Sequence, residues 1–132
     1  EGRKSTVRVA APRDAIVHDE WARRWWVPLP LVDESNRAAT TTFVRVAAGE
    51  EHTAIVARPL TGRRHQLRVH FAWIGHAIVG DPLFEAVGAT GRTLLHAWRL
   101  AFDTPTGRRV ECRAEPDGEF FAHFDASPVL PD

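Results

Sequence analysis

The chain has 132 residues, with 17 Lys plus Arg against 17 Asp plus Glu, so its formal net charge is zero. This length allows one small domain with a buried core, and a hydrophobic content of 44% is ordinary for a globular protein. One cysteine, no apolar run near the roughly 20 residues of a membrane span and no signal-peptide pattern predict a cytoplasmic protein without a disulfide framework or membrane contact.

The first part of the chain predicts a strand and then an aromatic segment. Residues 4–10 alternate in polarity and include β-branched side chains, as strands do. Trp21 and Trp25 are one helical turn apart, and Pro28 prevents a long helix beyond them. The nearby tryptophans favour a packed aromatic cluster over a surface that stacks on bases.

Two hairpins are predicted in the rest of the chain. Residues 41–47 and 53–59 are rich in Thr, Val, Ile and Phe and are joined by a Gly-Glu-Glu turn. Residues 94–102 and 108–114 form the second pair, joined by a turn that contains Pro and Gly. Both hairpins predict antiparallel pairing of neighbouring strands.

A helix is predicted between the hairpins. No Gly or Pro interrupts the chain from Arg63 to Ile74, and Leu67, Phe71 and Ile74 share one helical face. Gly75 follows as a C-terminal stop. The elements together predict a single α+β domain over residues 1–132, with a mostly antiparallel sheet of hairpins packed on a central motif helix.

Positive charge is concentrated in this helix and just before it. Residues 52–80 contain no Asp or Glu but include Arg58, Arg63, Arg64 and Arg68. Such a patch attracts phosphate, RNA or carboxylate groups, unless acids from elsewhere in the fold neutralise it. An unpaired cation on a largely apolar helix is costly, so we expect Arg68 to face an anionic site.

Other chemistries have little support in the sequence. His65 and His70 are five residues apart and lie off a common helical face, and no His-Glu-x-x-His pattern occurs, so no metal site is expected. Cys112 lies in a predicted strand without marked activating neighbours. There is no glycine-rich phosphate loop and no nucleophile elbow.

Two sequence blocks resemble a known family. The first, at residues 61–82, contains Gly-Arg-x-His-Gln-Leu-Arg-Val-His and then Gly-His-x-Ile-Val-Gly-Asp-Pro. The second is Leu-Leu-His-Ala at residues 94–97, followed by Leu100-x-Phe102-x-x-Pro105. In this order and spacing, the blocks resemble the RluA-like family of RNA pseudouridine synthases, and specifically the C-terminal half of the catalytic domain.

The resemblance implies a reaction and a set of site residues. Such enzymes isomerise uridine to pseudouridine in RNA, with rRNA or tRNA as the expected partner, and they need no cofactor. The target nucleotide is flipped into a pocket. Arg68 matches the family arginine that pairs with a catalytic Asp. The expected RNA- or substrate-binding residues are Arg63, Arg64, His65, Gln66, Leu94 and Leu95, with one of the two leucines as the apolar pocket residue.

The sequence departs from the family where the chemistry resides. The family Asp lies in a His-Arg-Leu-Asp motif followed by Thr-Ser-Gly, and no such motif occurs here. Asp14, Asp19 and Asp33 lack its flanking residues. Thr6 aligns with the family Tyr, and Phe84 stands where Tyr often follows Gly-Asp-Pro. We therefore expect the partner of Arg68 to be an Asp that is absent from this chain. The chain by itself should not catalyse the reaction.

Two functions without chemistry stay open. In the first, the chain is an RNA-binding module whose arginines contact phosphates, so that its affinity falls steeply with salt. In the second, it is a protein-interaction domain whose exposed sheet edge pairs with another chain. That partner would be a second copy, giving a homodimer, or a missing N-terminal half of the domain. Sedimentation of the isolated chain would discriminate the second function.

Overall fold

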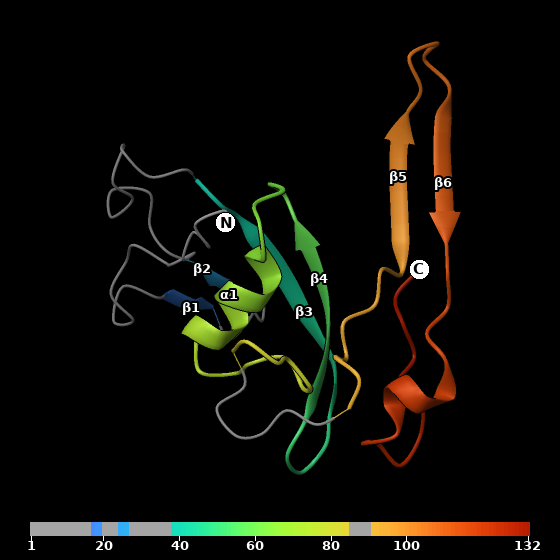
Figure 1. Ribbon diagram of the computed structural model, residues 1–132. Coiled ribbons are helices and arrows are strands. Elements are labelled where there is room, and N and C mark those ends of the chain that lie inside the picture. The colour runs from blue at the N-terminus through green and yellow to red at the C-terminus, as the bar shows by residue number, and fades with distance from the viewer. Residues whose placement is uncertain (1–16, 20–23, 27–37, 85–90) are drawn as a thin grey trace, which may run out of the picture.

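The computed structural model describes residues 17–19, 24–26, 38–84 and 91–132 (Figure 1). The strand predicted over residues 4–10, with Thr6, lies outside these residues, as do Trp21, Asp14 and Asp33. The described elements, in chain order, are β1 (Val17–Asp19), β2 (Arg24–Trp26), β3 (Thr41–Ala48), β4 (Thr53–Pro59), α1 (Gln66–Trp73), β5 (Arg99–Asp103), β6 (Arg109–Arg113) and the 3₁₀ turn η3 (Gly118–Phe121). No helix among them is long and apolar enough to cross a bilayer.

The described strands pair as three separate antiparallel sheets of two strands each, β1–β2, β3–β4 and β5–β6. With one α-helix among these hairpins, the expected α+β composition is confirmed. The helical spacing of the first tryptophans is wrong for Arg24–Trp26, because those residues form β2 and pair with β1. Strand pairing of neighbouring residues overrides a weak local periodicity there.

The first predicted hairpin is confirmed almost to the residue. In β3–β4, Thr41 lies opposite Pro59 and Ala48 lies opposite Thr53, with one irregularity between Arg45 and Ala47. The β-branched and aromatic residues of both strands suit the pleated surface. The long, regular pairing makes this hairpin the platform for the helix.

The helix α1 is shorter than predicted at its start and ends as predicted. It begins at Gln66 rather than Arg63 because His65 adopts a left-handed backbone, with φ of 56°. At its end, Gly75 has φ of 90°, and the N–H of His76 donates to the carbonyl oxygen of Phe71 at 2.9 Å. The N–H of Gly75 also donates to the carbonyl oxygen of Ala72 at 3.1 Å. These two hydrogen bonds satisfy carbonyl groups that the last turn of the helix would otherwise leave without a partner.

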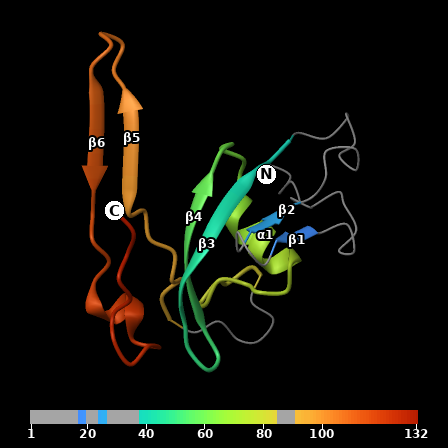
Figure 2. The ribbon, with the colours of Figure 1, turned by 180° about the vertical axis from the view of Figure 1, so that it is seen from behind.

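The helix packs on the β3–β4 hairpin. The rings of Phe43 and Phe71 meet edge to face, with centroids 5.2 Å apart, and Val69 and Phe71 are buried. Figures 1 and 2 show α1 beside β3–β4, whereas β5–β6 stands away from the helix on the far side of β4. The expected packing of both hairpins on the helix is therefore not confirmed.

The second hairpin and the tail differ in detail from their predictions. Pairing in β5–β6 begins at Arg99 rather than Leu94, and every residue of β5 is exposed. The tail, expected to be irregular, contains the single turn η3, whose first residue follows the capping Asp117. Within it Phe121 is buried against Phe120, with ring centroids 5.0 Å apart.

Candidate functional site

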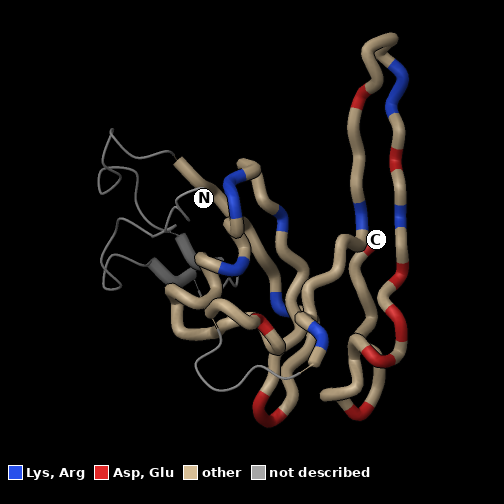
Figure 3. The backbone as a smooth tube through the Cα atoms, in the orientation of Figure 1, with Lys and Arg blue, Asp and Glu red and all other residues tan. Residues whose placement is uncertain are grey.

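Basic residues gather around the start of α1. Figure 3 shows Lys and Arg positions in the loop before the helix, in the helix and along β4. Arg58, Arg63 and Arg64 are exposed, so an anionic partner can reach them. The Nε of Arg63 donates to the carbonyl oxygen of Ala38 at 2.9 Å, which fixes the direction of that side chain. The acid-free stretch of sequence therefore has solvent-facing cations.

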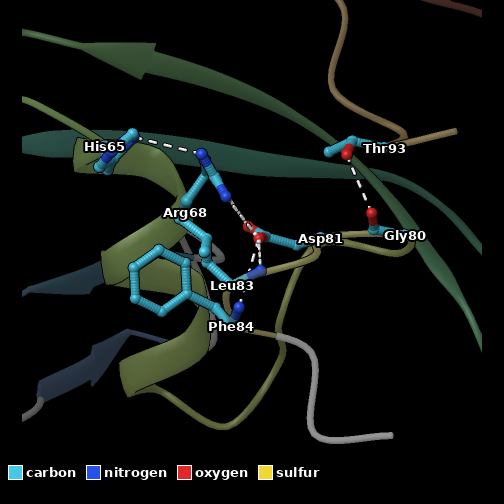
Figure 4. A network of polar contacts seen from close by, with 7 residues as sticks. All are labelled: His65, Arg68, Gly80, Asp81, Leu83, Phe84 and Thr93. Atoms are coloured by element: carbon cyan, nitrogen blue, oxygen red, sulfur yellow. Dashed lines mark hydrogen bonds and ion pairs between the residues drawn. The ribbon is translucent and has the colours of Figure 1, made fainter. Parts of the chain in front are cut away.

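Arg68 differs from these arginines because it is paired inside the chain. Its Nε donates to Oδ2 of Asp81 at 2.8 Å, and its Nη2 donates to Oδ1 at 2.7 Å (Figure 4). The Asp81 side chain is fully buried, and that of Arg68 is 19% exposed. A two-point pair of this kind fixes the plane of the guanidinium as well as its position.

The backbone also holds the Asp81 carboxylate. Its Oδ1 accepts from the N–H of Leu83 at 2.9 Å and from that of Phe84 at 3.3 Å. The hydrogen bonds from Arg68, helped by these backbone donors, lower the pKa of Asp81 below its ordinary value of 3.8. The pKa of Arg68 is raised in turn by its hydrogen bond to Asp81. Both groups are charged across the physiological pH range.

Asp81 was not among the expected site residues, and it is the anionic partner that the structure gives to Arg68. One signal in the sequence points to it: Asp81 is the first acid after the acid-free residues 52–80 and follows Gly80 in the motif. Asp81 is thus the anion that Arg68 meets within the chain. A further pairing of Arg68 with an Asp from outside the chain stays a prediction.

The other contacts of Arg68 leave part of the guanidinium available. Its Nη1 donates to Nδ1 of His65 at 3.2 Å, and the guanidinium carbon lies 5.4 Å from the centre of the Phe84 ring. Of the five N–H groups of an arginine, Asp81 engages two and His65 one, so two have no partner among the described residues. Those donors can bind a second anion or a carbonyl.

A third segment is attached to this site through Gly80. The hydroxyl of Thr93 donates to the carbonyl oxygen of Gly80 at 2.9 Å (Figure 4), and the N–H of Leu94 donates to that of Val79 at 2.8 Å. Gly80 has φ of 74°, a left-handed conformation that favours glycine. These two hydrogen bonds join the turn before Asp81 to the segment that contains Thr93, Leu94 and Leu95, called here the leucine segment.

A small pocket opens beside the guanidinium. Its volume is about 220 Å³, which is less than a drug-sized ligand needs and suits a single small group. The lining residues come from the end of β4, the loop before α1, the first helical turn and the leucine segment: Pro59, Thr61, Gly62, Arg63, His65, Gln66, Leu67, Arg68 and Leu95. The structure thus brings four of the expected binding residues together with Arg68.

Two of the expected residues lie apart from this pocket. Leu94 lines a much larger groove instead, although its neighbour Leu95 lines both. Arg64 is exposed and does not line the pocket. Of the two leucines considered for the apolar pocket position, Leu95 is the one placed beside Arg68.

Gln66 is held by the chain itself. Its Oε1 accepts from the hydroxyl of Thr61 at 2.7 Å and from the N–H of Arg63 at 3.0 Å. Its Nε2 donates to the carbonyl oxygen of Thr40 and to the hydroxyl of Thr41, both at 2.9 Å. The side chain is buried and its amide forms four hydrogen bonds, so it ties the loop before α1 to β3. Its role in RNA binding stays a prediction.

Among the described residues, no group of three or more His, Cys, Asp or Glu side chains is arranged to hold a metal ion. Cys112 lies exposed in β6, away from the residues around Arg68.

No protein-family model matches the sequence. The dual-specificity RNA pseudouridine synthase RluA of Vibrio cholerae is 39% identical over 109 residues, covering 75% of this chain and 44% of that protein. The RluA of Vibrio vulnificus is 35% identical, covering 86% and 50%. The RluA of Escherichia coli K12 is 38% identical, covering 64% and 41%. The chain thus spans about half the length of these relatives, and it belongs to the RluA-like family of pseudouridine synthases.

Proposed function

We propose that the chain supplies part of a pseudouridine synthase site, which isomerises uridine to pseudouridine in rRNA or tRNA. The observation that carries the proposal is the Arg68 guanidinium, held by Asp81 beside a small pocket that Leu95 also lines. Relatives that share 35–39% identity are RNA pseudouridine synthases. The whole reaction is assigned to the complete domain, of which this chain is the C-terminal half.

Within that domain the described residues bind and orient. Arg68 offers its two remaining N–H groups to the catalytic Asp that the family resemblance implies, and Asp81 keeps the guanidinium in the required plane. Leu67 and Leu95 provide apolar contact for the uracil ring in the pocket. Because the chain lacks the family Asp motif, it is inactive alone.

RNA is held outside the pocket by exposed arginines. Arg63, which lines the pocket, and the exposed Arg64 next to it in the chain lie just before α1, where they reach phosphates next to a flipped nucleotide. Neutralising phosphates releases counterions, so the affinity of the chain for RNA depends steeply on salt.

Binding of a uridine-containing single-stranded RNA to the purified chain, followed by fluorescence anisotropy over a series of salt concentrations, tests this proposal. Replacing Arg63 and Arg64 together by Ala should lower the slope of log K against log salt by about 1.4, or 0.7 for each phosphate contact. Arg108 and Arg109, an exposed pair in the other hairpin, are the matched control and should leave the slope unchanged. Equal effects of both pairs would contradict a localised RNA surface.

Activity is tested separately by digesting the RNA and measuring pseudouridine by chromatography. The chain alone should form none. Adding the part of the Vibrio cholerae relative outside the 109 matched residues should restore formation, and Arg68→Ala should abolish it. Product from the chain alone would refute its inactivity. Salt-dependent binding without product in the reconstituted mixture would favour the non-catalytic RNA-binding module.

A further inference from the structure

The pocket wall that Leu95 provides belongs to neither a helix nor a strand. Residues 92–98 have no regular secondary structure, and β5 begins only at Arg99. The Leu95 side chain is 46% exposed, so burial in a core does not fix it either. Hydrogen bonds of the residues around Leu95 therefore determine where this part of the pocket wall lies.

The residues before Leu95 are anchored to the turn after α1. The hydroxyl of Thr93 and the N–H of Leu94 donate to carbonyl oxygens of that turn, as described above. The N–H of Leu95 donates to the carbonyl oxygen of Thr93 at 2.9 Å, which closes a three-residue γ-turn within the leucine segment. This bond stays inside the segment, so the side of Leu95 that leads to β5 needs an anchor of its own.

His96 supplies that second anchor by binding the tail. Its Nε2 lies 2.8 Å from the carbonyl oxygen of Ala114, the residue that follows β6. A carbonyl oxygen can only accept, so we assign the ring proton to Nε2, which donates. In the opposite direction, the N–H of Ala114 donates to the carbonyl oxygen of Trp98 at 2.9 Å. Two hydrogen bonds thus join the chain just after Leu95 to the start of the tail.

The His96 ring also packs on the 3₁₀ turn η3. Its centroid lies 5.9 Å from that of Phe120, with the ring planes at 61°. Phe120 in turn meets the buried Phe121 edge to face, and its N–H donates to the carboxylate of Asp117 at 2.9 Å. Edge-to-face contacts of this kind are favourable and directional. The tail therefore gives the imidazole a structured support.

We propose that His96 is a positioning residue of the synthase site, which holds Leu95 at the pocket through its hydrogen bond to Ala114. His96 does not itself line the pocket, so it acts on the uracil ring through Leu95 and not by contact. The tail thereby takes part in binding the base. The inference rests on the proposed function, because Leu95 contacts uracil only where the pocket receives the flipped uridine.

Recognition of the base tests this role. Two short single-stranded RNAs are compared by fluorescence anisotropy, one with a single uridine and one with an abasic site in its place. The ratio of their affinities for the chain reports contact with the base. His96→Phe keeps a ring but loses the N–H donor, so it should lower the ratio about fivefold, the size of one ordinary hydrogen bond. The salt dependence, which phosphate contacts set, should not change. An unchanged ratio would overturn the inference.

His96→Gln is the rescue variant. Its amide N–H can take the place of the imidazole Nε2–H, so the ratio should return to that of the parent chain. His76→Phe is the matched control, because His76 is exposed and does not line the pocket. An equal loss of the ratio in His76→Phe, or the same loss in His96→Gln as in His96→Phe, would overturn the inference.

Hydrogen exchange of the chain without RNA separates positioning from a direct contact. In His96→Phe, the amides of Leu95 and Ala114 should exchange about fivefold faster, because one hydrogen bond no longer opposes local opening. The amide of Leu94, bonded to the turn after α1, should keep its rate. A lower affinity ratio without faster exchange at Leu95 would make His96 a direct contact of the base and overturn the inference.

The two measurements also keep the inference and the proposed function apart. A parent chain that binds both RNAs equally would refute the placement of uracil in the pocket. Faster exchange at Leu95 and Ala114 in His96→Phe would in that case still support the anchoring of Leu95 by His96. A preference for uridine that survives in His96→Phe would support the proposed function and overturn the inference.

Discussion

Asp81 and Arg68 form a two-point ion pair in which the carboxylate is completely removed from solvent. Removing one partner of such a pair leaves an uncompensated charge inside the protein, which usually costs more than the pair contributes in net stability. This relationship determines both the geometry of the site and the behaviour expected of its variants.

Asp81→Asn should lower the free energy of unfolding by about 3 kcal/mol, because the amide cannot neutralise Arg68 or accept at both oxygens. Urea denaturation of the purified chain measures the change. Asp117→Asn is the control: Asp117 pairs with Arg92 at a similar 2.8 Å, but both side chains are largely exposed, and Asn can still cap η3. A loss with Asp117→Asn as large as that with Asp81→Asn would show that burial of the pair is not decisive.

Acidification should weaken the fold in two steps. The pKa of His70 is lowered below 6.5 by burial, so its neutral form is favoured in the fold, and stability falls as the pH drops below 6.5. The pKa of Asp81 is lowered below 3.8 mainly by Arg68, so its contribution is present above that pH and is lost as the pH falls further. Denaturation curves at several pH values measure both steps.

Substitution of one histidine separates the two steps. His70→Gln removes the titrating ring but can still bond the hydroxyl of Thr41, which His70 meets at 2.9 Å. The decline that starts below pH 6.5 should then shrink, and the acid step should stay. His76→Gln, at an exposed position, is the control. A first step that survives in His70→Gln would contradict its assignment to this residue.

Gly80→Ala should be strongly destabilising for two reasons. The residue has φ of 74°, and an added Cβ would overlap the backbone carbonyl oxygen of Arg92, which cannot move as a side-chain end can. Gly107→Ala isolates the first reason, since Gly107 has φ of 81° and open space where the Cβ would lie. Thermal unfolding should show a loss of about 1–2 kcal/mol for Gly107→Ala, from left-handed strain alone, and a clearly larger loss for Gly80→Ala.

Gln66→Ala distinguishes a structural role from an RNA-binding role. The substitution removes four part-buried hydrogen bonds, among them the one that the N–H of Arg63 donates, so it should cost about 2–3 kcal/mol of stability. Denaturation and anisotropy are measured on the same preparation. A variant as stable as the parent chain that no longer binds RNA would make Gln66 a direct contact.

The sequence was sufficient for elements whose signals are local. β3–β4 and the Gly75 helix stop follow from strand composition and glycine placement, and the structure has them where expected. The start of α1 was misplaced because the left-handed His65 breaks the helix without a Gly or Pro. The predicted strand from Leu94 starts late because the N–H of Leu94 donates to the carbonyl oxygen of Val79 and that of Leu95 to the carbonyl oxygen of Thr93, so strand pairing begins at Arg99.

The site shows the same division. The need of Arg68 for an anion follows from an apolar helical face, which periodicity reveals. The identity of that anion, Asp81, depends on how the loop after α1 returns to the helix, 13 residues along the chain, and no periodicity encodes that return. Likewise, Leu95 rather than Leu94 lines the pocket, and nothing in the Leu-Leu pair itself distinguishes the two residues.

The separation of β3–β4 from β5–β6 has a consequence for cooperativity. Since no ladder links the two hairpins among the described residues, local opening of one does not break the hydrogen bonds of the other. We expect such a chain to unfold in at least two blocks, with β5–β6 the less protected because every residue of its first strand is exposed. An element that bridges the hairpins would merge the blocks into a single all-or-none transition. A substitution that loosens packing at Phe71 would then also lower the free energy of opening measured at Leu100.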